Sequence, residues 1–220
     1  MADRFRGAVF DLNGTLVDDI RFHFDAWRDL AKKLGHDMDE VLFQSFNGLK
    51  NEDIFPRLLG RSVSAEEIAT LGEEKEIAYR AMYRPHLAPV AGALALLDRL
   101  HAGGVRLAVA SSAPPANRAM VLEGLELLER FDVVVAAEHL PGKPAPHVFL
   151  EAARRLEIAP EECVAFEDAA NGVRSAVSAG MFVVGITTNN PARTLLDAGA
   201  RYAVTDFTAL PEELERRLPR

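Results

Sequence analysis

The chain has 220 residues, of which 49% are hydrophobic, so it can bury a core large enough for one domain or for a domain with a small insertion. Its formal net charge of -8 argues against nucleic acid or an anionic membrane surface as a main partner, because both would repel an acidic protein. A single cysteine, Cys163, excludes an internal disulfide, and no apolar run reaches the roughly 18 residues of a membrane span, so we expect a soluble cytoplasmic protein.

The first predicted strand is the apolar run Gly7–Phe10, which ends at Asp11. About ninety residues separate it from the next apolar run, far more than an ordinary crossover needs. Apolar residues recur at helical spacing before Gly35, and the Ser64–Glu67 stretch has the pattern of a capping box that opens another helix. We therefore predict a small helical cap domain at 19–88, inserted into an α/β core made of residues 1–18 and 89–220.

Beyond the insertion, short apolar runs alternate with longer amphipathic stretches. The runs predicted as strands are Val105–Ala110, Val133–Ala136, Val164–Phe166, Phe182–Ile186 and Tyr202–Val204. The stretches predicted as helices are Ala91–Leu100, Ala116–Leu128, Ala145–Leu156 and Gly172–Ala179. Strands that alternate with helical crossovers are typical of an α/β fold with a doubly wound, Rossmann-like parallel sheet.

Polar side chains follow four of the predicted strands, at the end where ligands of open parallel sheets bind. In chain order they are Asp11 and Asn13, then Ser111 and Ser112, then Lys143, then Glu167 and Asp168. Mg2+ usually binds through one or two carboxylates together with substrate phosphate. A hydroxyl and a lysine can offset the remaining phosphoryl charge. These residues together indicate a magnesium-dependent phosphoryl-transfer site.

The segment from Asp11 to Asp18, DLNGTLVD, resembles the first motif of the haloacid dehalogenase superfamily. Ser111, Lys143–Pro146 and Glu167–Ala169 match the other three motifs of that superfamily in order. The chain is most similar to the β-phosphoglucomutase-like phosphatases, because His23 and the residues around it look like the first cap helix of that group. The resemblance implies that the carboxylate of Asp11 attacks phosphorus and forms an aspartyl phosphate, which water or a second hydroxyl then discharges.

The same resemblance implies roles for the other motif residues. It implies that Mg2+ is held by Asp11, Asp168 and the backbone carbonyl of Asn13, with Glu167 supporting that shell. It also implies that the phosphoryl group is bound by Ser111 and Lys143, while Thr15 steadies the first loop. For Ser112, which precedes Pro114, we consider both a helix N-cap and a substrate contact.

We expect residues of the cap domain to determine which substrate binds. The loop around Gly48 matches the loop that closes on substrate in this group, Lys75 matches a basic cap position, and His23 is a candidate to face the substrate. Trp27 is predicted to lie in the core of the cap. The mutase of this group uses a lysine and an arginine where this chain has Asn47 and Asn51, and an amide is a poor substitute for a bidentate guanidinium grip on phosphate. We therefore favour a monomeric phosphatase of small sugar-phosphate monoesters, with a mutase as the alternative.

Asn13 departs from the pattern of the superfamily, which normally has an aspartate there as the general acid and base. An amide has no titratable proton, and losing a positioned acid or base typically costs about 10²–10⁴-fold in rate. Three explanations are open: an aspartate replaced by design to trap a slow state, a natural asparagine with weak or altered activity, or spontaneous deamidation of Asn13-Gly14 to an active aspartate. A protein that binds a phosphorylated metabolite without turnover is the alternative from another class.

Overall fold

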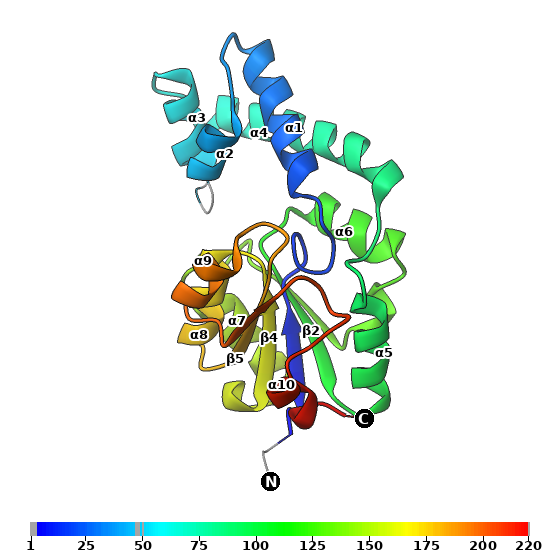
Figure 1. Ribbon diagram of the computed structural model, residues 1–220. Helices are drawn as coiled ribbons and strands as arrows, with labels where there is room; N and C mark the ends of the chain where they lie inside the picture. Colours follow the sequence, from blue (N-terminus) through cyan, green and yellow to red (C-terminus); the bar gives the residue numbers. More distant parts are fainter. Residues whose placement is uncertain (1–3, 47–48, 50, 220) are drawn as a thin grey trace. The chain divides into compact units, whose positions relative to one another are not determined.

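The structure is a computed structural model that describes residues 4–46, 49 and 51–219. The chain divides into two compact units, one formed by residues up to 18 together with residues from 87 onward, the other by residues 19–86 (Figure 1). Just before and just after the segment 19–86, Val17 and Pro89 form an antiparallel bridge with each other. The Val90 N–H also donates to the Leu16 carbonyl at 2.8 Å. Within the described residues, no helix is long and apolar enough to cross a membrane.

The larger unit is built on a six-stranded sheet with the order β3-β2-β1-β4-β5-β6, in which every neighbouring pair is parallel. The strands are β1 Gly7–Phe10, β2 Arg106–Ser111, β3 Val133–Ala136, β4 Cys163–Glu167, β5 Phe182–Ile186 and β6 Tyr202–Val204. This confirms the predicted doubly wound α/β fold. The strand order reverses its direction between β1 and β4. Ligands of such sheets bind beyond the carboxyl ends of the strands at this point, which here means beside the residues that follow β1.

The helices of this unit are α5 Ala93–Ala102, α6 Pro115–Gly124, α7 His147–Leu156, α8 Ala170–Ser178, α9 Ala192–Asp197 and α10 Glu212–Arg217. Helix α6 ends four residues before its predicted end. The reason is local: Glu126 takes a positive φ of 53°, and the Leu127 N–H bonds to the Leu122 carbonyl at 2.7 Å, which closes the helix. A short 3₁₀ turn at Leu128–Arg130 then leads into β3.

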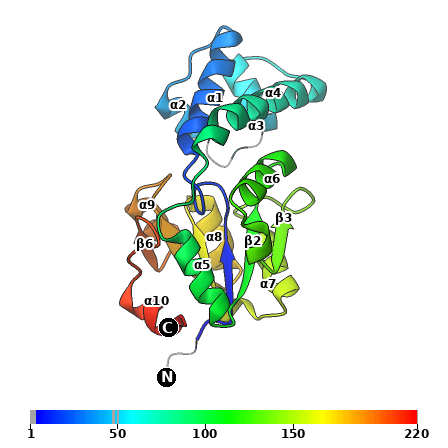
Figure 2. The same cartoon turned by 90° about the vertical axis from the view of Figure 1, so that its right-hand side faces the viewer.

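The sheet is covered on both faces, because successive strand residues point to opposite sides. Val9 belongs to the core cluster formed with α7, α8 and α9. Its neighbour Phe10 points the other way and stacks on Phe166 with ring centroids 4.7 Å apart. Figure 2 shows α5 and α8 on opposite faces of the sheet. Because β1 is buried throughout, its carboxyl end, and hence Asp11, has a fixed position.

The smaller unit consists of α1 Ile20–Lys33, α2 Glu40–Ser45, α3 Asn51–Leu59, α4 Ala65–Tyr83 and a 3₁₀ turn at Arg84–His86. Trp27 and Phe55 pack in its hydrophobic core with ring centroids 5.2 Å apart, which confirms the core position predicted for Trp27. The Ser64 hydroxyl accepts from the Glu67 N–H at 3.2 Å, so Ser64 is the N-cap of α4. This unit therefore has a core of its own.

Candidate active site

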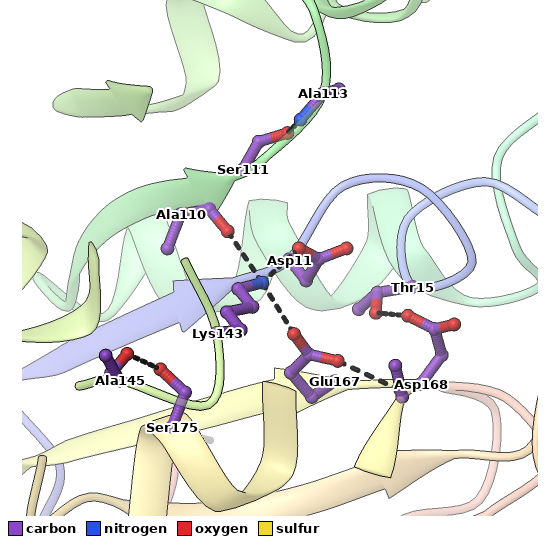
Figure 3. A network of polar contacts seen from close by, with 11 residues as sticks. Asp11, Thr15, Ala110, Ser111, Ala113, Lys143, Ala145, Glu167, Asp168 and Ser175 are labelled. Atoms are coloured by element: carbon purple, nitrogen blue, oxygen red, sulfur yellow. Dashed lines mark hydrogen bonds and ion pairs between the residues drawn. The ribbon is translucent and has the colours of Figure 1, made fainter. Parts of the chain in front are cut away.

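Asp11, Lys143 and Glu167 meet at the carboxyl end of the sheet. The Asp11 N–H donates to the Phe166 carbonyl at 3.0 Å, which joins the ends of β1 and β4. The Nζ atom of Lys143 donates to Oδ1 of Asp11 at 2.5 Å and to Oε1 of Glu167 at 2.6 Å (Figure 3). It also donates to the carbonyl of Ala110 on β2 at 3.2 Å. One ammonium group thus joins three adjacent strands.

The electrostatics of this cluster follow from its burial. Desolvation raises the pKa of Asp11 to about 7, although Lys143 opposes the rise, and Glu167 adds to it. Burial disfavours the Lys143 ammonium, but the carboxylates of Asp11 and Glu167 raise its pKa above the usual range. The pKa of Asp168 is raised well above its usual value, first by burial and then by repulsion from Glu167 and Asp11. Additional positive charge would further stabilise the charged forms of Asp11 and Asp168.

Asp168 is held by the loop that follows β1. Its side chain is buried, with 2% of the residue exposed, and Oδ1 accepts from the Thr15 hydroxyl at 3.0 Å. Gly14 has a φ of +83°, and a Cβ on it would lie 2.2 Å from Oδ2 of Asp168. Only glycine allows this approach. Thr15 therefore has a definite contact in the site: it orients the carboxylate of Asp168, as Figure 3 shows.

The two serines after β2 differ in their surroundings. Ser111 is the last residue of β2 and is 1% exposed, and its Oγ accepts from the Ala113 N–H at 3.0 Å. A hydroxyl that accepts such a bond can still donate its own proton to a ligand. Ser112 is exposed. Helix α6 begins at Pro115 with Pro114 as its N-cap, so the N-cap interpretation of Ser112 is wrong.

Glu167 is fixed on both of its oxygens. Oε1 accepts from Lys143, and Oε2 accepts from the Ala169 N–H at 3.0 Å. Gly172, in the first turn of α8, leaves room for this carboxylate, because a Cβ there would lie 1.7 Å from Oε1. Both oxygens of Glu167 thus accept hydrogen bonds from the protein, which suits a residue that supports the metal ligands.

Sequence reasoning missed several residues that contact the four motif segments. Ser175 on α8 donates to the Ala145 carbonyl at 2.6 Å, in the loop that carries Lys143 (Figure 3). Asn190 donates to the Asp168 carbonyl at 3.0 Å, and Thr188 donates to the Gly14 carbonyl. The sequence does mark Thr188 and Asn190 as candidates, because both follow the predicted strand Phe182–Ile186, just as Asp11 and Asp168 follow other predicted strands.

In the smaller unit, the structure brings His23 and Lys75 together. Lys75 Nζ lies 3.1 Å from His23 Nδ1 and 2.7 Å from Oε1 of Glu76. The His23 ring stacks on Tyr79 with centroids 3.8 Å apart. Burial lowers the pKa of both His23 and Lys75. The remaining predicted residue of this unit, Gly48, lies outside the described residues, as do Asn47 and Lys50.

The predicted metal ligands are Asp11, Asn13, Glu167 and Asp168. Within the described part of the chain, no group of three or more His, Cys, Asp or Glu side chains is arranged around a common metal position, and Lys143 contacts two of the predicted carboxylates. The donor set nevertheless fits Mg2+, which needs only one or two carboxylates when phosphate and water complete its shell. Asp11, Glu167 and Asp168 are buried at this end of the sheet beside the single ammonium of Lys143, so carboxylates outnumber cations among these residues, as a cation site requires. The residues present therefore fit a magnesium ion.

The chain is similar to known proteins along most of its length. A family model described as haloacid dehalogenase-like hydrolase matches residues 5–180. The β-phosphoglucomutase of Bacillus subtilis is 31% identical over 84% of this chain and 85% of that protein. The fructose-1-phosphate phosphatase of Escherichia coli is 33% identical over 84% of this chain and 98% of that protein. The crystal structure of a family IA hydrolase from Entamoeba histolytica aligns with a TM-score of 0.88 and 30% identity, covering 95% of this chain and 96% of that one.

Proposed function

The chain belongs to the haloacid dehalogenase-like hydrolases, and on that premise we propose that it is a magnesium-dependent phosphatase of small sugar phosphates that acts through an aspartyl phosphate on Asp11. The observation that carries the proposal is the position of the Lys143 ammonium between the carboxylates of Asp11 and Glu167 at the carboxyl end of the sheet. Relatives named as phosphatases of fructose 1-phosphate and of phosphorylated carbohydrates support the substrate class.

In the first half-reaction, a carboxylate oxygen of Asp11 forms a bond to phosphorus while the bond from phosphorus to the sugar oxygen breaks. The nucleophile must be ionised, and Lys143 favours that form of Asp11 against the effect of burial. Ser111 and Lys143 are proposed to donate to the phosphoryl oxygens. The departing sugar oxygen needs a proton, and the amide of Asn13 cannot supply one, so this proton comes from water.

In the second half-reaction, a water oxygen forms a bond to phosphorus, and the bond from phosphorus to Asp11 breaks. The carboxylate of Asp11 is regenerated, phosphate leaves, and the proton lost by the attacking water passes to solvent. Asn13 can orient this water through a hydrogen bond but cannot take its proton. Both half-reactions are therefore expected to be slow in this chain.

The metal contributes charge neutralisation at the transferring phosphoryl group when it is bound. Asp11, Asp168 and the Asn13 carbonyl are the proposed ligands, with Glu167 as support. Thr15 and the close approach of Gly14 keep the Asp168 carboxylate in place for this role.

The test is phosphate release from a panel of sugar phosphates with MgCl2, measured for the parent chain and for Asn13→Asp. We expect slow release from the parent chain and a gain of about 10²–10⁴-fold in Asn13→Asp, because a general acid and base is restored. Acid quenching followed by peptide mass analysis should find the phosphoryl group on Asp11. The proposal fails if Asn13→Asp releases no phosphate from any member of the panel.

A mutase is the second candidate, and the similarity to the Bacillus subtilis β-phosphoglucomutase favours it. The discriminating assay offers β-glucose 1-phosphate together with a bisphosphate primer. Isomerisation without release of phosphate would replace the phosphatase assignment with the mutase. A third result, tight binding of sugar phosphate by Asn13→Asp without either reaction, would identify a non-catalytic phosphometabolite-binding protein.

A further inference from the structure

The loop that follows β5 lies beside the predicted metal ligands and has the sequence Thr187-Thr188-Asn189-Asn190. In the register of the sheet, Gly185 of β5 is level with Glu167 of β4. The loop after β5 therefore begins at the same level of the sheet as Asp168, which directly follows β4.

Three consecutive side chains of this loop contact the site. The Asn190 Nδ2 atom donates to the backbone carbonyl of Asp168 at 3.0 Å. The Asn189 side chain is hydrogen-bonded to the Asp168 carboxylate. The Thr188 hydroxyl donates to the backbone carbonyl of Gly14, the residue whose missing Cβ makes room for that carboxylate. One loop thus holds both the backbone and the side chain of Asp168, together with the turn packed against it.

The usual structural role of asparagines before a helix does not explain these contacts. An asparagine that starts a helix caps it by accepting from a backbone N–H of the first turn. Helix α9 begins at Ala192 with Pro191 at the N-cap position, and the Asn190 amide donates away from that helix to Asp168.

Asp168 needs such support because it is buried against other negative charges. With 2% of the residue exposed, the Asp168 carboxylate depends on hydrogen-bond donors of the protein: the Thr15 hydroxyl donates to its Oδ1 at 3.0 Å, and Asn189 is the second donor. Two neutral donors from different loops also fix the orientation of the carboxylate. Partners that orient a metal-binding side chain in this way typically change metal affinity by about 10–100-fold when they are removed.

We propose that Asn189 and Asn190 are positioning residues that fix the carboxylate and the backbone of Asp168 for binding Mg2+, and that Thr188 fixes the Gly14 turn beside them. The inference rests on the proposed magnesium-dependent function. It adds the loop after β5 to the four motif regions as a fifth element of the site.

The experiment is calorimetric titration of the full chain with MgCl2 alone, for the parent and for Asn189→Ala, Asn190→Ala and Thr188→Val. The matched control is Thr205→Val, an exposed threonine that follows β6. We expect the dissociation constant for Mg2+ to rise about tenfold or more in the two asparagine variants and less in Thr188→Val, with the control unchanged. In phosphate release, the Mg2+ concentration for half-maximal rate should rise while the rate at saturating Mg2+ is largely kept.

Unfolding midpoints recorded without metal separate this role from a purely structural one. An unchanged dissociation constant combined with a lowered midpoint would make Asn189 and Asn190 ordinary loop residues and overturn the inference, while the proposed function would stand. If the parent chain itself bound no Mg2+, the proposed metal dependence would be wrong, and this inference would fall with it.

Discussion

The Nζ atom of Lys143 lies 2.5 Å from Oδ1 of Asp11, although 132 residues separate them in the chain. Both side chains are largely buried, with exposed fractions of 11% and 12%. A buried charge that loses its partner is strongly destabilising, whereas an exposed ion pair contributes little. The pair therefore has consequences for stability as well as for chemistry.

We expect Lys143→Met to lower the free energy of unfolding by about 3–5 kcal/mol, because it leaves Asp11 and Glu167 buried without their common counter-charge. The measurement is urea denaturation followed by circular dichroism. Adding Glu167→Gln should recover part of the loss. The control is Lys33→Met, because Lys33 pairs with Glu74 on the surface and its loss should cost no more than about 1 kcal/mol. Equal losses in the two lysine variants would contradict the prediction.

Asp11→Asn should abolish phosphate release, because an amide cannot act as the nucleophile. Removing a nucleophile of this kind lowers turnover by at least about 10⁴-fold. The comparison is made in the Asn13→Asp background, where activity is expected to be measurable. Asp37→Asn, at an exposed position, is the control and should retain activity. Substantial phosphate release by Asp11→Asn would mean that another group attacks phosphorus.

The Asn13-Gly14 bond should resist deamidation in the folded protein. Deamidation requires the Gly14 nitrogen to attack the side chain of Asn13, but the Gly14 N–H donates to the Val17 carbonyl at 2.7 Å and Gly14 is buried. The intact mass should therefore stay constant as the native sample ages, while a sample held in urea gains the mass of the acid. If the native sample converted as fast as the unfolded one, the explanation that Asn13 matures into an aspartate would gain support.

The stability of the protein should fall on acidification because of His23. Burial and Lys75 lower the pKa of His23 well below its usual value, so the folded state keeps this imidazole neutral while the unfolded state binds a proton. Stability is thus fully present above a pH of about 6.5 and is lost as the pH falls below it, by at most about 1.4 kcal/mol per pH unit.

Urea denaturation at several pH values between neutral and mildly acidic measures this slope. His23→Gln should flatten the profile, since it removes the titrating group. His101→Gln, at an exposed position, controls for the loss of an imidazole. A His23→Gln profile as steep as that of the parent chain would show that other groups cause the acid sensitivity.

The strands were predictable because burial on both faces leaves continuous apolar runs. Gly7–Phe10 and Phe182–Ile186, which are buried along nearly their whole length, have the predicted bounds. Helices α9 and α10 were missed, because each spans only six residues, too few for a clear helical period. The end of α6 was misplaced, because the positive φ of Glu126 leaves no mark in the hydrophobic pattern.

The position of the site was predictable, but its contacts were not. The rule for parallel sheets places Asp11, Lys143 and Glu167 at one edge without saying which atoms meet. That the Lys143 ammonium joins the other two depends on the path of a long loop after β3. The contacts of Thr15 and Asn190 with Asp168 likewise depend on loop conformations, which sequence spacing does not encode.

The bridge between Val17 and Pro89 has a consequence for how the chain tolerates change. The two ends of the inserted segment are held together within the sheet-bearing unit, and the entropy of closing a long connection grows only slowly with its length. The segment from 19 to 86 packs around a hydrophobic cluster of its own. We therefore expect this segment to behave as an exchangeable module, which can be lengthened, trimmed or replaced while the strand order and the buried carboxylates stay as they are.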